Sequence, residues 1–212
     1  LEVRFLHDPE AESGFVGATA RNASRIATRT SLARARRNAI AQIAMTYKPG
    51  SPIPTAPYTD LEIKRLIDAG RMIGPKMHVT APYLEGAGAF TPVMHQLTGP
   101  DDARRMVNYW ADAGATSFKA YMNITRDELR AVVEEAHKRG LKVTGHLCSV
   151  SFREAVALGI DNLEHGMLTA SDFSSRKRPD VCPVEQLGEL GLADPSGQTA
   201  KDVIQTMVKN KV

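Results

Sequence analysis

Long apolar runs are missing from this sequence of 212 residues, and their absence excludes the usual helical membrane protein. No stretch reaches the run of about 18 apolar residues that a transmembrane helix requires. No basic start followed by an apolar segment is present, so we recognise no secretory signal peptide and favour the cytoplasm. The first residue is Leu1 rather than methionine, and we therefore expect a processed product or a piece of a longer protein.

Cysteine is scarce as well, because Cys148 and Cys182 are the only two in the sequence. Two cysteines decide little about the class of protein, since both could be free thiols or they could pair with each other. Free cysteine is among the most buried residue types. We therefore favour two free, buried thiols over a disulfide.

Acidic residues are absent from Ser13 to Thr59, although the chain has 24 in total. This segment has a charge of +7 against +3 for the whole chain, so the remainder is mildly acidic at −4; its basic residues are Arg21, Arg25, Arg29, Arg34, Arg36, Arg37 and Lys48. A basic arm of this kind could bind nucleic acid or anionic lipid. No aromatic interleaving and no nucleic-acid motif accompany it, so we do not favour nucleic acid as a partner.

Two compositions divide the chain. Residues 1–57 form a divergent Arg-rich segment, and they end in the stretch 48–57, which holds four prolines. So many prolines exclude a helix or a central strand, and we interpret the stretch as a linker or irregular loop. Residues 58–212 have the ordinary composition of a folded domain.

Residues 58–212 repeat one pattern, in which a helical segment ends at a glycine and a short apolar strand follows. "TRDELRAVVEEAHKRG" runs into "LKVTGH", for example, and "SFREAVALG" runs into "IDNLEHG". The helices at 59, 125 and 151 each begin with a capping box, formed by Thr59 and Glu62, Thr125 and Glu128, and Ser151 and Glu154. Helices that alternate with short strands predict consecutive βαβ units, an α/β fold with a parallel sheet.

Potential metal ligands stand where three successive strands end: Lys119 in "SFKAY", His146 in "VTGH" and His165 in "NLEH". Ligands of α/β sheets and barrels collect at the carboxyl ends of the strands. If the strands are neighbours, we expect the three side chains to converge. Neutral imidazoles bind Zn²⁺ and similar ions, and a metal-bound water supplies hydroxide near neutral pH.

Structural roles are the alternative for each of these residues. A single strand-end histidine is usually a hydrogen-bonded core residue, and a single lysine is usually solvated or paired with a carboxylate. By strand alternation, Glu164 lies opposite His165, and we expect it to pair with a helix Arg or Lys. We expect structural or surface roles for the other three histidines of the 58–212 region: His137 in the last turn of its helix, His78 within a buried strand, and His95 in the loop "EGAGAFTPVMHQLTG".

The segments "ADAGATSFKAYMNITRDELRAVVEEAHKRGLKVTGHLCS" and "ALGIDNLEHG" resemble the metal-dependent amidohydrolase superfamily, in particular its imidazolonepropionase and prolidase-like branch. The resemblance covers roughly residues 58–212. It implies a TIM-type (β/α)₈ barrel with one or two divalent metals at its mouth, and Zn²⁺ is the metal that we favour. It also implies hydrolysis of a C–N bond in a small-molecule amide, cyclic amide or dipeptide, and a homo-oligomer is compatible with it.

The resemblance assigns a role to each strand-end residue. Lys119 matches the lysine that CO₂ converts to a metal-bridging carbamate, and His146 and His165 match two metal-ligating histidines. Tyr121 matches a residue that polarises the substrate carbonyl. Its alternative role is that of an aromatic residue packed at the barrel rim.

Two family features are missing from the sequence. No His-x-His occurs near the start, where His7 is the only early histidine, and no strand-end aspartate follows residue 200. We therefore expect a partial barrel, about strands 3 to 6 with their helices, and with the first and last strands missing or divergent. The chain is then either a working hydrolase or a catalytically incompetent fragment that needs a partner.

Overall fold

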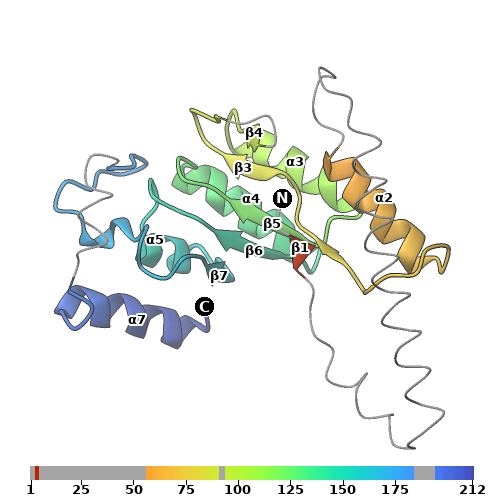
Figure 1. Ribbon diagram of the computed structural model, residues 1–212. Helices are drawn as coiled ribbons and strands as arrows, with labels where there is room; N and C mark the ends of the chain where they lie inside the picture. Colours follow the sequence, from red (N-terminus) through yellow and green to blue (C-terminus); the bar gives the residue numbers. More distant parts are fainter. Residues whose placement is uncertain (1–2, 5–55, 91–93, 184–193) are drawn as a thin grey trace, which may run out of the picture. The chain divides into compact units, whose positions relative to one another are not determined.

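The computed structural model describes residues 3–4, 56–90, 94–183 and 194–212 (Figure 1). The chain divides into two units, one from Glu2 to Val79 and the other from Thr80 to Val212 together with Leu1. The Arg-rich arm and nearly all of the proline-rich stretch lie outside the described residues, so the expected boundary at residue 57 stays a prediction. Within the described ranges, every helix is too short or too polar to cross a membrane.

The unit from Glu2 to Val79 contains helix α2 (Ala56–Asp68) and an antiparallel pair of short strands, β1 (Val3–Arg4) and β2 (His78–Val79). The capping box at Thr59 predicted a later start for this helix, and the proline-rich stretch was expected to exclude a helix up to residue 57. Both predictions are wrong at this end. Pro57 fits the first turn of α2, where a backbone N–H has no partner within the helix.

Five parallel strands form the sheet of the second unit, in the order β4-β3-β5-β6-β7 (Figure 1). Their bounds are β3 (Tyr83–Glu85), β4 (Met94–Gln96), β5 (Ser117–Ala120), β6 (Lys142–Gly145) and β7 (Asn162–Leu163). From β3 to β7 by way of β5 and β6, spatial neighbours follow each other in chain order. Strand β4 pairs with the other edge of β3 and contains His95, so the loop expected at this position is wrong. Three residues are too few to show strand alternation in a sequence.

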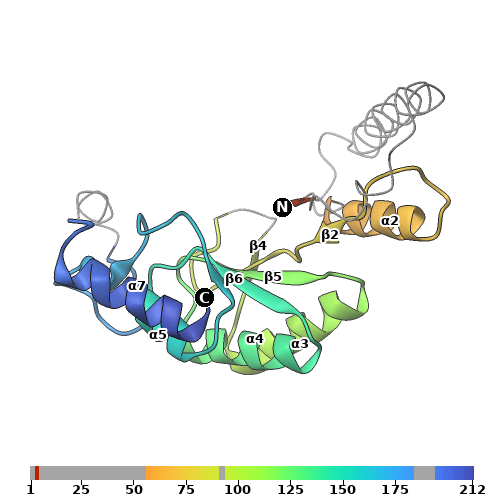
Figure 2. The same cartoon turned by 90° about the horizontal axis from the view of Figure 1, so that it is seen from below.

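Helices connect these strands and pack on one face of the sheet. Figure 2 shows α3 (Pro100–Asp112), α4 (Arg126–Lys138) and α5 (Phe152–Ala157) on the same side of β5 and β6. After β7 come a 3₁₀ turn, η2 (Ser171–Phe173), and helix α7 (Gln198–Asn210), which contacts α5. Apart from β4, the strands follow each other in chain order with helices on one face, which is the arrangement of consecutive units of a (β/α)₈ barrel. The expected α/β fold, a partial TIM-type barrel, is confirmed.

The local signals within this unit account for its helices. Thr125 and Ser151 cap α4 and α5, and both predicted capping boxes are present with both of their hydrogen bonds. The predicted apolar stripe of α4 is fully buried, with side chains no more than 2% exposed at Leu129, Val132, Val133 and Ala136. This stripe is the buried face of α4, which contacts β5 and β6.

Candidate active site at the strand ends

A buried ion pair joins strand β5 to the end of β7. Lys119 Nζ lies 2.5 Å from Glu164 Oε2, and the two side chains are 7% and 5% exposed. Thr144, the β6 residue paired with Lys119 in the sheet, donates from its hydroxyl to Glu164 Oε1 at 3.0 Å. Residues on β5, on β6 and directly after β7 therefore contribute to one polar cluster.

The charge of Glu164 is stabilised by its neighbours. Burial alone would raise the pKa of this carboxyl group. The hydrogen bond and the positive charge of Lys119 outweigh burial, and the pKa lies below its ordinary value. Glu164 is therefore a carboxylate at neutral pH.

The two predicted histidines lie beside this pair. The ring centroids of His146 and His165 are 4.6 Å apart, in an edge-on arrangement with an interplanar angle of 66°. His165 Nε2 is 3.4 Å from Glu164 Oε2. Burial, followed by the neighbouring His165 and Lys119, lowers the pKa of His146. A neutral His146 ring can accept a proton or ligate a metal.

Glu164 has a different partner from the one that its sequence position predicted. The expected partner was a basic residue on a helix, whereas the structure pairs Glu164 with Lys119 on β5. The reason is that β7 ends at Leu163, and His165 has a left-handed backbone with φ of 64°. Strand alternation stops before His165, so Glu164 and His165 both reach the cluster.

Aromatic rings line the cluster on one side, with Tyr121 at their centre. The Tyr121 ring lies 4.6 Å from that of His146 and stacks at 5.6 Å on Tyr83, from β3. Lys119 Nζ lies 4.6 Å above the Tyr83 ring, within the range of a cation–π contact. Phe90 adds a ring 6.1 Å from Tyr121. Tyr121 thus stands next to the predicted ligands, and Tyr83 is a site residue that sequence reasoning missed.

The spacing of the histidine pair is that of an edge-on ring contact, for which ring centroids lie about 4.5–7 Å apart, and the observed distance is 4.6 Å. Among the described residues, no group of three or more His, Cys, Asp and Glu side chains has an arrangement that could hold a metal ion.

Glu85 is a second residue that sequence reasoning missed. Its carboxylate is fully buried at the end of β3 and accepts hydrogen bonds from the backbone N–H groups of Gly86 at 2.8 Å and Asn123 at 2.6 Å. Burial raises its pKa. The contact ties the end of β3 to the loop that follows Tyr121. A Cβ at Gly86 would lie 1.9 Å from the Asn123 carbonyl oxygen, so a glycine is required here.

Two of the other predicted histidines, His137 and His95, lie outside the cluster and hydrogen-bond to aspartates. His137 Nε2 is 2.8 Å from Asp161 Oδ2, near the amino ends of β6 and β7. His95 Nε2 is 3.1 Å from Asp102 Oδ2, at the start of α3. The structural role expected for His137 is confirmed, whereas His95 is half-buried and hydrogen-bonded to Asp102 rather than at the surface.

The two cysteines form a disulfide between Cys148 and Cys182, with Cα atoms 4.8 Å apart. The expectation of free thiols is therefore wrong. The two residues are separated by 34 positions, and their approach depends on the path of the chain after β7. A preference for burial, on which the expectation rested, does not decide between a buried thiol and a buried disulfide. Cys148 is fully buried in the disulfide.

Three solved structures are similar to part of this chain. A candidate prolidase from Bifidobacterium longum is 28% identical, and the match covers 52% of this chain and 30% of that chain with a TM-score of 0.44. A Xaa-Pro dipeptidase with methionine bound in its active site is 17% identical, with coverages of 54% and 36% and a TM-score of 0.45. A bottromycin amidohydrolase is 22% identical, with coverages of 62% and 28% and a TM-score of 0.48. No family model and no curated protein matches the chain.

The chain spans about a third of the length of these three structures. All three TM-scores lie below 0.5. The chain is thus similar, over part of its length, to proteins of the prolidase and amidohydrolase type.

Proposed function

We propose that the chain is, or is part of, a metal-dependent hydrolase of C–N bonds, with a small amide, cyclic amide or dipeptide as substrate. One observation carries the proposal: Lys119 on β5, His146 directly after β6 and His165 two residues after β7 meet in one cluster, in which Lys119 is buried and His165 is 46% exposed. A cluster at the carboxyl ends of neighbouring parallel strands has the position of an active site in an α/β barrel.

His146 and His165 would hold a divalent metal, with Zn²⁺ the first candidate. When bound, the metal supplies an activated hydroxide and polarises the substrate carbonyl. The low pKa of His146 keeps this ring neutral and available as a ligand. Lys119 would contribute after reaction with CO₂, as a carbamate whose oxygens can bind a second metal. A carbamate beside Glu164 would bring two negative groups together, and bound cations would stabilise that arrangement.

Tyr121 would orient the substrate. Its ring is fixed between His146 and Tyr83, and its hydroxyl is the group on this ring that can donate a hydrogen bond to a substrate carbonyl oxygen. A donor aimed at the developing oxyanion stabilises the transition state more than the ground state. A packing role for Tyr121 is compatible with this substrate-orienting role, because the ring makes the packing contacts and the hydroxyl would make the hydrogen bond.

The test is hydrolysis of a panel of dipeptides, N-acyl amino acids and cyclic amides in the presence of Zn²⁺, with detection of the released amine. His146→Ala and His165→Ala should each lower kcat/KM by at least about 100-fold and reduce the bound metal, since loss of a ligand exceeds the roughly 10–100-fold cost of losing an outer-shell partner. His137→Ala is the matched control, because His137 pairs with Asp161 at the opposite end of the strands. Full activity and metal content in both site variants would refute the proposal.

An incompetent barrel fragment is the second candidate function. The five-stranded sheet of the described residues is open, with β4 at one edge and β7 at the other. Exposed edges favour pairing with a further chain or segment. Metal analysis separates the two candidates: one or two Zn²⁺ per chain supports the hydrolase, and a metal content of zero after Zn²⁺ loading supports the fragment.

A further inference from the structure

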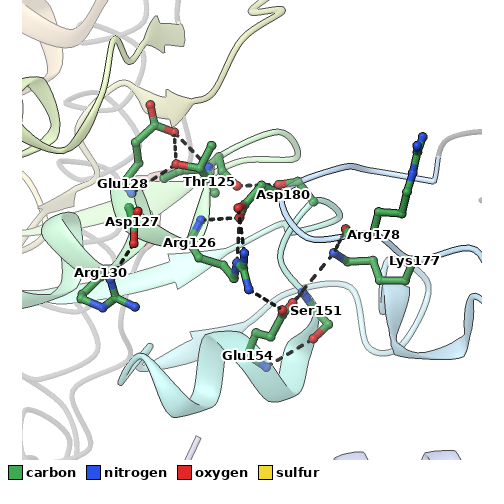
Figure 3. A network of polar contacts seen from close by, with 12 residues as sticks. Thr125, Arg126, Asp127, Glu128, Arg130, Ser151, Glu154, Lys177, Arg178 and Asp180 are labelled. Atoms are coloured by element: carbon green, nitrogen blue, oxygen red, sulfur yellow. Dashed lines mark hydrogen bonds and ion pairs between the residues drawn. The ribbon is translucent and has the colours of Figure 1, made fainter.

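Residues 174–182, which we name the strap, follow η2 and are bonded to the loops after two of the site strands. Figure 3 shows the polar contacts of the strap with the starts of α4 and α5. Within the strap, an antiparallel bridge pairs Arg178 with Val181, and Asp180 has a left-handed backbone with φ of 57°. Asp180 and Cys182 lie two positions apart in this tight turn, and each attaches the strap to a different segment beside the site.

The first attachment is an ion pair to the start of α4, which follows Lys119 and Tyr121 in the chain. Asp180 Oδ1 accepts from the backbone N–H of Arg126 at 2.8 Å and from its Nε at 3.0 Å, while Oδ2 accepts from Nη2 at 3.0 Å (Figure 3). Burial alone would raise the pKa of Asp180, but the Arg126 hydrogen bonds outweigh it and lower the pKa. Because Asp180 binds both the side chain and the backbone of Arg126, the contact fixes the orientation of the strap relative to the start of α4 as well as the distance between them.

The second attachment is covalent. The disulfide joins Cys182 to Cys148, which is two positions after His146. Leu147 and Cys148, the two residues after His146, are fully buried. Ser149 then donates from its backbone N–H to the Met122 carbonyl at 2.8 Å and from its hydroxyl to the Ile124 carbonyl at 2.5 Å. The loop after His146 is therefore held by the β5 loop through Ser149 and by the strap through Cys148.

A third contact reaches the next helix. Lys177 Nζ is 3.9 Å from Glu154 Oε2, and Glu154 closes the capping box at the start of α5 (Figure 3). Arg126 Nη1 is 3.6 Å from the other oxygen, Oε1, of the same carboxylate. The strap and the starts of α4 and α5 thus form one network at the carboxyl ends of the strands, beside the candidate active site.

We propose that the strap positions the His146 ring, and that reduction of its disulfide releases this ring from its contacts with Tyr121 and His165. Cys182 is a positioning residue, because it is bonded to Cys148, two positions after His146, and Asp180 holds the same strap through Arg126. The consequence for metal binding depends on the proposed function, whereas the ring arrangement itself does not. The proposal makes the site sensitive to small dithiols.

The release step balances as a thiol–disulfide exchange. One thiolate of an added dithiol attacks a sulfur of the Cys148–Cys182 bond, and its second thiol closes the dithiol into a ring. Two electrons and two protons pass from the dithiol to the protein. The products are two free cysteine thiols and the cyclic disulfide of the reagent.

The first test is NMR of the metal-free chain with labelled histidine, before and after treatment with dithiothreitol at constant pH. Thiol titration should count two new thiols. The ring resonances of His146 and His165 should shift or broaden, and those of His137, at the opposite ends of the strands, should stay unchanged. Two titrated thiols with unchanged His146 resonances would overturn the proposal.

A second variant covers the case in which reduction unfolds the chain. Asp180→Asn leaves the disulfide intact and removes one charge from the Arg126 contact. It should shift the His146 ring resonances, and Asp180→Glu should partly restore them. Asp112→Asn, which weakens the ion pair of Asp112 with Arg139 between α3 and α4, is the matched control and should leave His146 unchanged. If Asp180→Asn and Asp112→Asn leave the His146 spectrum equally unchanged, the strap does not position this ring.

Zn²⁺ titration of the same samples separates this proposal from the proposed function. If the chain binds Zn²⁺, the reduced protein should bind it at least about tenfold more weakly, as is usual when groups that orient a ligand are lost. If the oxidised chain binds no Zn²⁺ and the His146 resonances still respond to reduction, the proposed function fails and the positioning role stands. Equal affinity before and after reduction would contradict the positioning role alone.

Discussion

At the scale of single residues, the Lys119–Glu164 pair determines the charge of the candidate site. Two opposite charges with almost no exposure stabilise each other only while both are present, because each charge alone would be buried without compensation. The strand-end position of Lys119, His146 and His165 can be predicted from sequence. The role of Glu164 cannot be predicted from sequence, because it depends on the left-handed backbone of His165. A residue other than glycine gives no sequence signal for that conformation.

Substitution of one partner tests this pair. Glu164→Gln should lower the free energy of unfolding by about 3 kcal/mol or more, because it leaves the Lys119 ammonium buried without its counter-charge. The double variant Lys119→Met, Glu164→Gln should recover a large part of this loss. Urea denaturation of the four proteins of the cycle measures the coupling. Additive effects of the two substitutions would show that the ion pair contributes nothing to stability.

The Tyr121 hydroxyl is the second residue-scale test. Tyr121→Phe keeps the ring between His146 and Tyr83 but removes the proposed donor to the substrate carbonyl. On a substrate that the wild-type chain hydrolyses, kcat should fall about 100-fold while KM changes little. Tyr109→Phe, on an exposed position of α3, is the control. A kcat equal to that of the wild type would leave Tyr121 with the packing role alone.

At the scale of elements, the end of β6 is held in place by side chains that pack closely against its backbone. Strand β6 ends at Gly145, directly before His146. A Cβ at Gly145 would lie 2.8 Å from Ile160 Cδ1 and 2.8 Å from Leu147 Cγ, closer than real contacts allow. The helix boundaries at Thr125 and Ser151 could be predicted because capping is local. The packing beneath β6 could not, since Leu147 and Ile160 are brought together only by the fold.

Gly145→Ala tests this packing. The added methyl group should lower the free energy of unfolding by about 1–3 kcal/mol, the usual cost of overpacking a core. Ile160→Val removes one of the two clashing atoms, so the double variant Gly145→Ala, Ile160→Val should be less unstable than the sum of the two single variants predicts. Thermal or urea unfolding measures all three. If the losses in free energy of unfolding of the two single variants simply add in the double variant, the destabilisation by Gly145→Ala does not come from its contact with Ile160.

At the scale of the whole molecule, regular βα units build a sheet that presents the site, and ion pairs stabilise both of its ends. The alternation of helices and strands was sufficient to predict this architecture. The disulfide and the strap were not predictable, because the contact of residues 148 and 182 depends on the irregular chain path after β7. The Arg-rich arm lies outside the described residues, so its binding to nucleic acid or anionic lipid stays a prediction.

Acid should destabilise the second unit. Burial opposes the charge of Glu164, Asp161 and Asp180, but hydrogen bonds from Lys119, from Lys142 and His137, and from Arg126 outweigh it, so all three pKa values are lowered. Their stabilisation is present above the ordinary carboxyl pKa of about 4 and is lost as the pH falls through the lower folded-state values.

The corresponding measurement is urea unfolding between pH 3 and pH 7, values chosen to bracket the ordinary carboxyl pKa of about 4. The free energy of unfolding should be nearly constant above about pH 5 and should fall below about pH 4. Asp161→Asn should lower the stability at pH 7 and reduce the fall in acid, because Asp161 accepts from Lys142 at 2.6 Å and from His137 at 2.8 Å. A wild-type stability that is independent of pH over this range would contradict these three assignments.

Anomalous diffraction at the zinc absorption edge, from crystals of the oxidised chain grown with Zn²⁺ and bicarbonate, tests the central claim most directly. The account predicts an anomalous peak about 2.0–2.1 Å from one ring nitrogen of each of His146 and His165, with Lys119 beside it. A fully loaded crystal with its only zinc peaks at other residues, or with the two imidazoles bound to separate ions, would contradict it.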